Sequence, residues 1–284
     1  MRFVEGEGLR LAVFEAGLRS NPTVVLVHGF PDDHRVWSGV IDALSARFHV
    51  VAYDVRGAGE SDAPPDTAGY AIARLYGDLR AVLKATAPGK RVHLVGHDWG
   101  SIQLWGMVTD PAIAGLARSF TTLSGPGLDQ ASRWMRRALT SGGARDVLRQ
   151  LGRSWYIAAF QLPRVPEWVV EHRIAPGWVT QMRETEGLDE PEPLVLRNAL
   201  NAIGLYRANV GRPVSPRGQR DPVVPTQFLV AEDDLYVTSA LVRGVAAATP
   251  GAELHSLDGG HWVLRRDPAL VAEKIADFVA RHEG

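Results

Sequence analysis

The sequence contains no cysteine. Disulfides, thiol nucleophiles and thiolate metal sites are therefore excluded. Long apolar runs are also missing: none approaches the roughly 20 residues that span a bilayer, and the N-terminal stretch alternates polar and apolar positions, unlike a signal peptide. An excess of one charge is absent too, since 31 Lys+Arg and 32 Asp+Glu leave a net charge of −1. We therefore expect a soluble cytoplasmic protein that binds neither nucleic acid nor membranes.

Strand patterns alternate with helix patterns through the first half of the chain. Residues 1–20 have the alternation and the glycines of an antiparallel hairpin. Continuous β-branched runs, typical of buried parallel strands, occupy residues 23–30, 49–57, 92–98 and 119–126. Residues 36–48 and 75–87 carry apolar side chains every three or four positions, as helices on a sheet do. This order predicts an α/β protein whose mostly parallel sheet is covered on both faces.

Residues 128–221 differ in composition from the rest of the chain. Strand patterns vanish there, seven prolines separate short helical pieces, and 14 arginines stand against 10 acidic residues. Strand patterns return at 226–234 and 252–261, and an amphipathic helix pattern occupies 268–282. The segment is therefore predicted to be a helical insertion between two parts of one α/β core.

The turn Gly96-His97-Asp98-Trp99-Gly100 lies between a predicted strand and a predicted helix. A turn with small residues at both ends forces its central residue into a strained backbone conformation and presents that side chain above the sheet edge. The backbone N–H of Trp99 and the dipole of the following helix favour an ionised Asp98. Taken alone, the pattern also allows Asp98 to be a simple helix cap.

Three further loops follow predicted strands at the same edge of the sheet. The backbone N–H of Phe30, in the stretch "HGFP", can complete an oxyanion hole with that of Trp99. Asp234 and His261 each follow one of the last two strands, which gives the chain order nucleophile, acid, histidine. Because the carboxyl ends of parallel strands share one crevice, we predict a catalytic triad of Asp98, Asp234 and His261.

The stretches "HGFPDDHRVW", "DVRGAGESD", "GHDWG" and "GGHW", with the late aspartate, resemble the α/β-hydrolase superfamily and specifically its epoxide hydrolase branch. The resemblance covers nearly the whole chain. It implies an α/β-hydrolase fold, with a mostly parallel eight-stranded sheet flanked by helices and an inserted helical cap. The core would comprise 1–127 and 222–284, and the cap 128–221. Two cap tyrosines usually face the nucleophile in such enzymes, and "WYIAAFQ" and "GLYRANV" imply Tyr156 and Tyr206.

An aspartate nucleophile suits displacement at a saturated carbon. A serine would form a stable ether with an epoxide carbon, whereas a carboxylate forms an ester that water can cleave. We therefore predict an epoxide hydrolase in which Asp98 forms the ester. Tyr156 and Tyr206 would donate hydrogen bonds to the epoxide oxygen, and His261, oriented by Asp234, would activate the water. The product is a vicinal diol, and neither a metal nor an organic cofactor is required.

The expected partner is a small-molecule epoxide. Tryptophan and arginine residues in the cap suggest that it is bulky or aromatic. A homodimer is compatible with the sequence. The chain also resembles the hydrolase halves of some two-domain actinobacterial proteins that are fused to a reductase.

Two alternative functions remain open. A haloalkane dehalogenase would use the same Asp98 displacement with halide leaving, and the indole of Trp99 could hold the halide. That family often places an Asn after the His-Gly pair as a second halide donor, where this chain has Phe30. A non-catalytic ligand-binding protein of this fold would keep the cavity but would have little need of the complete triad.

Overall fold

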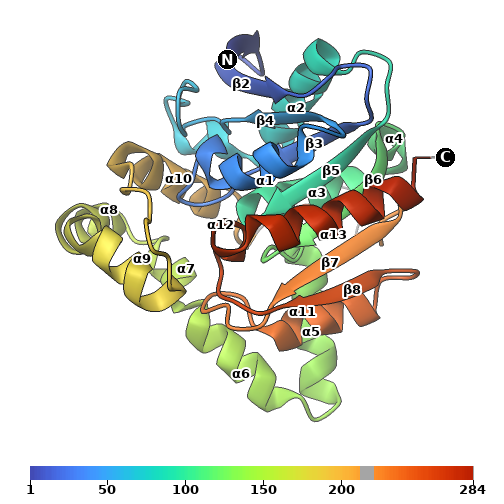
Figure 1. The fold of residues 1–284 in the computed structure, drawn as a ribbon. Coiled ribbons are helices and arrows are strands. Elements are labelled where there is room, and N and C mark those ends of the chain that lie inside the picture. The colour runs from blue at the N-terminus through green and yellow to red at the C-terminus, as the bar shows by residue number, and fades with distance from the viewer. Residues whose placement is uncertain (212–220, 284) are drawn as a thin grey trace.

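The computed structural model describes residues 1–211 and 221–283. Its centre is one eight-stranded sheet with the strand order β1-β2-β4-β3-β5-β6-β7-β8 (Figure 1). The β2 strand runs opposite to the other seven, which are parallel to one another. The strand bounds are β1 Arg2–Glu5, β2 Arg10–Ala16, β3 Thr23–Val27, β4 His49–Tyr53, β5 Val92–His97, β6 Ala117–Leu123, β7 Thr226–Ala231 and β8 Glu253–Leu257.

The burial of each strand matches its sequence pattern. Every residue of β3, β4, β5 and β7 is buried, as continuous apolar runs in a doubly covered sheet should be. The edge strand β1 instead alternates between half-buried and exposed positions and pairs with β2 as the predicted hairpin. The predicted α/β sheet is therefore confirmed.

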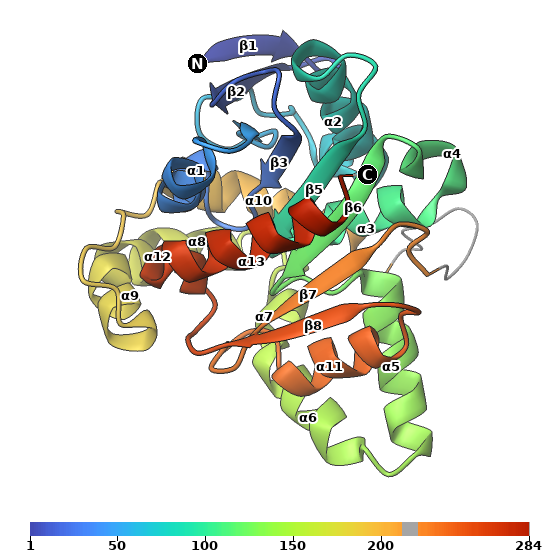
Figure 2. The same cartoon turned by 45° about the vertical axis from the view of Figure 1, so that its right-hand side comes forward.

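Helices cover both faces of the sheet and enclose two clusters of buried apolar side chains. On one face lie α1 (Ser38–Leu44), α12 (Val263–Arg266) and α13 (Pro268–Arg281), with α13 in the foreground of Figure 1. The other face is covered by α2 (Ile72–Thr86), α3 (Trp99–Thr109), the short α4 (Pro111–Ala114) and α11 (Ser239–Ala247), as Figure 2 shows from the side. The helix predicted at 36–48 is shorter than expected, because it begins as a 3-10 helix at His34–Trp37 and ends at Leu44.

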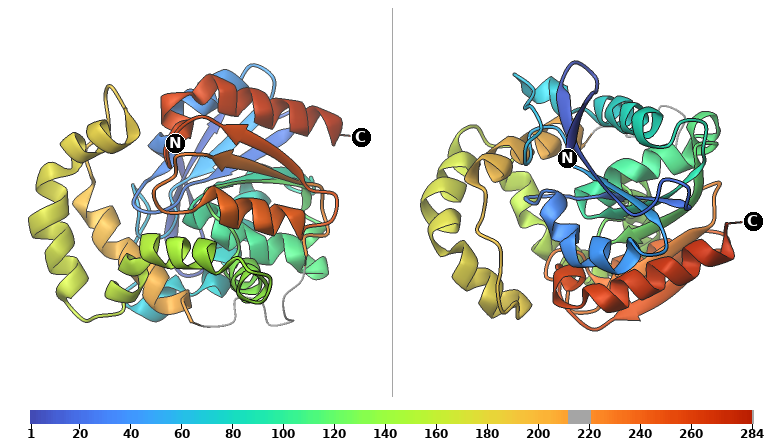
Figure 3. Two further views of the ribbon diagram at one scale, coloured as in Figure 1. Left: turned by 90° about the horizontal axis from the view of Figure 1, so that it is seen from below. Right: turned by 45° about the horizontal axis from the view of Figure 1, so that its top comes forward.

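The predicted helical insertion lies between β6 and β7. Among its described residues it contains only helices and loops. Its α-helices are α5 Leu128–Thr140, α6 Ala144–Arg153, α7 Trp155–Ala159, α8 Val165–Val169, α9 Trp178–Glu186 and α10 Leu196–Asn209, and a π-helix (Val170–Ile174) and a 3-10 helix (Ala175–Gly177) join α8 to α9. The α5 and α6 helices pack against α11, and α10 packs against α2 and the 3-10 helix Thr67–Tyr70. Between these two attachments, α8 and α9 stand to one side of the sheet (Figure 3).

Candidate active site

The loops that follow β3, β5, β7 and β8 meet at the carboxyl edge of the sheet. They carry Phe30, Asp98, Asp234 and His261, the four core residues predicted from sequence. All four follow parallel strands, so their approach is a direct consequence of the topology. The structure brings these residues together, and the helical insertion adds Tyr156 and Tyr206 to the same cavity.

Asp98 sits on the strained turn that its neighbours predict. Its backbone has φ 51° and ψ −125°, a conformation that few non-glycine residues adopt. The glycines on either side of Asp98 are needed because other backbone segments lie very close to them. A Cβ on Gly100 would overlap the carbonyl oxygen of Val27, and one on Gly96 would overlap the backbone of Ser101. Asp98 precedes α3 but makes no side-chain capping bond to it, so the simple helix-cap interpretation is wrong.

The two carboxylate oxygens of Asp98 have different surroundings. Oδ1 accepts a hydrogen bond of 2.7 Å from the backbone N–H of Phe30. Oδ2 lies 3.9 Å from Nε2 of His261. Burial raises the pKa of Asp98 to about 6, although the charge of His261 and the N–H groups of Trp99 and Phe30 act to lower it. Above that pH the side chain is an anion with one oxygen held by backbone donors and the other facing the imidazole.

Asp234 orients the imidazole of His261. Its Oδ2 lies 2.9 Å from Nδ1 of His261, and its Oδ1 accepts the backbone N–H groups of Tyr236 and Val237 at 2.7 and 2.9 Å. Burial acts to lower the pKa of His261, but the nearby carboxylates of Asp234, Asp98 and Glu186 raise it to about 9. The imidazole is thus a strong base whose Nε2 faces the candidate nucleophile.

Tyr156 on α7 and Tyr206 on α10 lie next to each other above Asp98. Their ring centroids are 5.9 Å apart, and the ring of Tyr206 meets that of Trp99 edge-on at 4.9 Å. Burial raises the pKa of both hydroxyls, so both stay protonated near neutral pH.

A cavity of about 470 Å³ opens over these groups. Most of its wall is aromatic or aliphatic and comes from the helical insertion, and its charged side chains are Asp98, Arg153 and His261. Its aromatic lining residues are Phe30, Trp155, Tyr156, Phe160, Trp178, Tyr206, Tyr236 and Trp262. A site of this size and lining suits an apolar organic molecule with one reactive polar group.

The comparisons with known proteins agree with this geometry. The model of the alpha/beta hydrolase fold family matches residues 22–267, most of the chain. This chain belongs to that family. Within the family it lies in the epoxide hydrolase branch, since epoxide hydrolase A of Mycobacterium tuberculosis is 35% identical over 318 residues that cover 98% of this chain and 96% of that protein.

Two further α/β-hydrolase relatives extend the comparison. The protein named "Probable oxidoreductase EphD" of Mycobacterium tuberculosis is 32% identical over 98% of this chain but only 49% of its own length. The chain therefore spans about half the length of the curated relatives of that name. The crystal structure of Bacillus megaterium epoxide hydrolase in complex with an inhibitor has a TM-score of 0.80 at 21% identity, and it covers 98% of this chain and 100% of that chain. This likeness shows the shared fold.

Sequence reasoning missed two acidic residues beside the α/β-hydrolase histidine. Asp32 accepts the indole N–H of Trp262 at 2.9 Å, and Glu186 accepts the backbone N–H of Trp262 at 3.2 Å. Burial raises the pKa of Asp32 to about 7 and also raises that of Glu186. The position of Asp32 directly after "HGFP" was an available signal. Nothing in the sequence around Glu186 indicates that its helix reaches the histidine loop.

The other histidines near the site serve the fold. His28 accepts the backbone N–H of Val55 at 2.9 Å through Nε2, and Nε2 of His97 lies 2.9 Å from the carbonyl oxygen of His261. Burial lowers the pKa of His97 to about 3, so it is neutral. Neither side chain lines the cavity.

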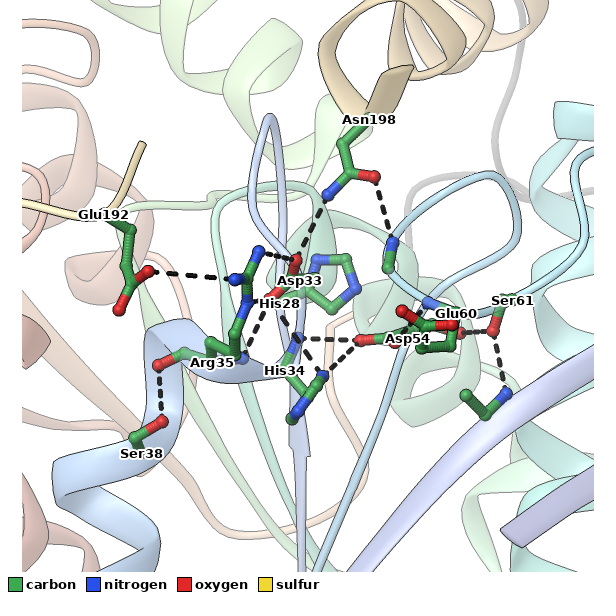
Figure 4. A network of polar contacts seen from close by, with 12 residues as sticks. His28, Asp33, His34, Arg35, Ser38, Asp54, Glu60, Ser61, Glu192 and Asn198 are labelled. Carbon is green, nitrogen blue, oxygen red and sulfur yellow. Dashed lines mark hydrogen bonds and ion pairs between the residues drawn. The ribbon is translucent and has the colours of Figure 1, made fainter. Parts of the chain in front are cut away.

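Asp33, His34 and Asp54 place three possible metal-ligand atoms within 4.8 Å of one another. Figure 4 shows that these atoms already have partners. Asp33 accepts from Arg35 and Asn198, and Oδ1 of Asp54 lies 2.7 Å from Nδ1 of His34. The cluster is a hydrogen-bond network that links the loop after β3 to α10.

No helix among the described residues has the length and apolarity needed to cross a membrane.

Proposed function

We propose that this chain is an epoxide hydrolase that opens its substrate through a covalent ester on Asp98. One observation supports this proposal above all: a buried carboxylate on a strained turn has a backbone donor on one oxygen, a histidine facing the other, and a tyrosine pair above it. Epoxide hydrolase A, which this chain matches over 96% of that protein's length, supports the same activity. The apolar cavity accounts for a bulky or aromatic epoxide as substrate.

In the first step Asp98 attacks one ring carbon of the epoxide. Its Oδ2 is the attacking oxygen, because Oδ1 is already held by the Phe30 N–H. The carbon–oxygen bond of the ring breaks, and Tyr156 or Tyr206 gives its proton to the oxygen that leaves the carbon. A phenolic hydroxyl, whose ordinary pKa near 10 is raised here by burial, suits this strongly basic oxygen. The step yields a hydroxyalkyl ester and one tyrosinate.

In the second step water cleaves the ester. Esterification removes the Asp98 charge that helps to raise the pKa of His261, so the ring releases its resting proton to solvent at this stage and regains it when Asp98 is a carboxylate again. The neutral ring, with Nδ1 bonded to Asp234, takes a proton from water, and the resulting hydroxide attacks the ester carbon of Asp98. Negative charge develops on Oδ1, where the Phe30 and Trp99 N–H groups stabilise it. Collapse releases the diol, which takes the proton from His261. The carboxylic acid left on Asp98 loses its proton, which restores the tyrosine.

The haloalkane dehalogenase alternative has less support. Halide binding there needs free N–H donors beside the nucleophile. In this structure the ring of Tyr206 packs edge-on against the indole of Trp99 at 4.9 Å, and Phe30 has no polar side chain to act as a second donor. We also propose that residues 128–221 form the cap and that 1–127 and 222–284 form the core. The cytoplasmic location and a homodimer stay predictions.

Product analysis on two substrate panels tests the proposal. Aryl and alkyl epoxides should give vicinal diols, and matched haloalkanes should release no chloride or bromide. Asp98→Asn should abolish diol formation while the cavity still binds the epoxide. Halide release without diol would replace the proposal with the dehalogenase. Tight binding without turnover of any epoxide would replace it with a ligand-binding protein.

A further inference from the structure

Glu186 reaches from the helical insertion to the turn that carries His261. It is the last residue of α9, which ends as Gly187 adopts the left-handed conformation with φ 63°. The side chain is only 4% exposed, and its Oε2 accepts the backbone N–H of Trp262 at 3.2 Å. Gly260, on the other side of His261, leaves the space this carboxylate needs, because a Cβ there would overlap it.

The other oxygen of this buried carboxylate has no hydrogen-bond partner among the residues that the structure describes. Oε1 of Glu186 is fully buried and unpaired, which is costly for a group whose only structural task is to bind one N–H. Burial raises the pKa of Glu186, but the charge of His261 favours its ionised form, and in that form Glu186 helps to raise the pKa of the imidazole. A buried carboxylate oxygen without a hydrogen bond can still be stabilised by the positive charge of a nearby imidazolium.

Several other groups act on the same imidazole. Asp234 lies on Nδ1, Asp98 faces Nε2, and the charge of Asp32 also interacts with the ring. Two neutral rings, those of His97 and Tyr236, lie 4.7 and 5.0 Å from it. Arg153 donates to the backbone carbonyl of Asp234. Glu186 is the member of this set that comes from α9.

We propose that Glu186 is a positioning residue for His261: it fixes the Gly260–Trp262 turn against α9 and places a negative charge behind the imidazole that stabilises the imidazolium formed during ester hydrolysis. This inference rests on the proposed epoxide hydrolase function. It assigns the insertion a part in both steps, because Tyr156 and Tyr206 serve ring opening and Glu186 serves hydrolysis.

The contribution of Glu186 should be greatest in the second step. Before reaction, the charge of Asp98 also faces Nε2 of His261. Once Asp98 is esterified it is neutral, and the remaining carboxylates must stabilise the imidazolium. Removing the charge of Glu186 should therefore slow hydrolysis of the ester and leave ring opening nearly unchanged.

Glu186→Gln tests this because it keeps an acceptor for the Trp262 N–H and removes the charge. Glu184→Gln is the matched control, since Glu184 is an exposed residue of the same helix. Rapid-quench kinetics with a styrene-type epoxide should show ester accumulation in Glu186→Gln. In Glu186→Gln, the pH below which ester hydrolysis slows should fall by about one unit. The rate on the plateau above that pH should be up to about tenfold lower. Glu184→Gln should match the unsubstituted protein.

The outcomes separate this inference from the proposed function. If Glu186→Gln folds, turns over epoxide and keeps the pH profile and burst of the unsubstituted protein, Glu186 has no electrostatic part and the inference is wrong. Glu186→Leu removes both the charge and the hydrogen-bond acceptor. If this variant is impaired and Glu186→Gln is not, Glu186 acts only through its hydrogen bond, and the inference also fails. If the unsubstituted protein forms no diol, the proposed function itself fails.

Discussion

The two tyrosines of the site are held by very different supports. Tyr206 lies on α10, which asparagine side chains bind to the core: Asn198 accepts the Gly59 N–H at 3.0 Å, and Asn209 accepts the Ile72 N–H at 2.9 Å. Tyr156 lies on the five-residue α7, which contains no buried residue. One tyrosine is therefore fixed to the core, whereas the other stands on a lightly packed segment.

This difference suggests that α7 and α10 have different roles within the insertion. Few buried contacts and exposed backbone are features of segments that open locally at low free energy. The α7 helix, which buries no residue, is therefore expected to open more readily than α10, which keeps Tyr206 over Asp98. Arg207 of α10 bonds to the carbonyl groups of Phe160 and Leu162, and these bonds link the residues after α7 to α10.

Removing the tyrosine hydroxyls should give the largest effect. Replacing both Tyr156 and Tyr206 by Phe should slow ring opening about 10³-fold, within the usual range for general acid catalysis. Tyr206→Phe alone should slow ring opening more than Tyr156→Phe does. Tyr206 is held over Asp98 by α10 and can donate without Tyr156, whereas Tyr156 on the lightly packed α7 replaces Tyr206 less well. Tyr76→Phe is the control, since its buried hydroxyl has no hydrogen-bond partner within residues 1–211 and 221–283 and lies outside the cavity. Equal losses at positions 156 and 206 in single-turnover kinetics would contradict the comparison.

The pH profile of ring opening should separate the core from the insertion. Burial raises the pKa of Asp98 to about 6, so protonation removes the nucleophile as the pH falls through that value. The rate should drop about tenfold for each pH unit below it. Because this limb belongs to the core, Tyr156→Phe should lower the plateau and leave the limb in place. A limb that moves with the tyrosine substitution would show that the tyrosine controls the carboxylate.

Loss of an α10 anchor should destabilise the fold. Asn209→Ala leaves the buried Ile72 N–H unpaired and removes the bond to the Tyr70 carbonyl, so we expect a loss of about 2–3 kcal/mol in the free energy of unfolding. Asn201 makes a single bond, to the Gly57 carbonyl, and Asn201→Ala should cost about 1 kcal/mol. Urea denaturation measures both values. Equal costs would mean that the additional bonds of Asn209 contribute nothing to holding α10 on the core.

A substitution on α7 should have the smallest effect on stability. Trp155 is 68% exposed and lines the cavity, so Trp155→Ala should change the free energy of unfolding by about 0.5 kcal/mol or less while raising KM. Leu148→Ala is a matched control, because Leu148 is 69% exposed but does not line the cavity. A large loss of stability at Trp155 would show that α7 is as firmly held as α10.

Sequence reasoning predicted the core half of the site because local patterns determine it. A strand followed by a turn residue gives the location of Asp98, Asp234 and His261, and the parallel sheet brings the strand ends together. Tyr156 and Tyr206 came from a family resemblance, since helical spacing alone does not show which face of a helix meets the cavity.

The contributions of the insertion beyond the tyrosines could not be predicted. Glu186 and Asn209 act through contacts between segments far apart in the chain, at Trp262 and Ile72. Such contacts depend on how proline-broken helices dock on the core. The way these helices dock is determined by side-chain packing and not by the hydrophobic periodicity of the local sequence.

Single turnover in ¹⁸O-water tests the covalent ester most directly. With enzyme in excess over epoxide, the first diol should carry no label in its new hydroxyl, because that oxygen is Oδ2 of Asp98. Mass spectrometry of the peptide containing Asp98 should then show one ¹⁸O gained by the protein. Label in the diol and none in the peptide would mean that water attacks the epoxide directly and that Asp98 is not the nucleophile.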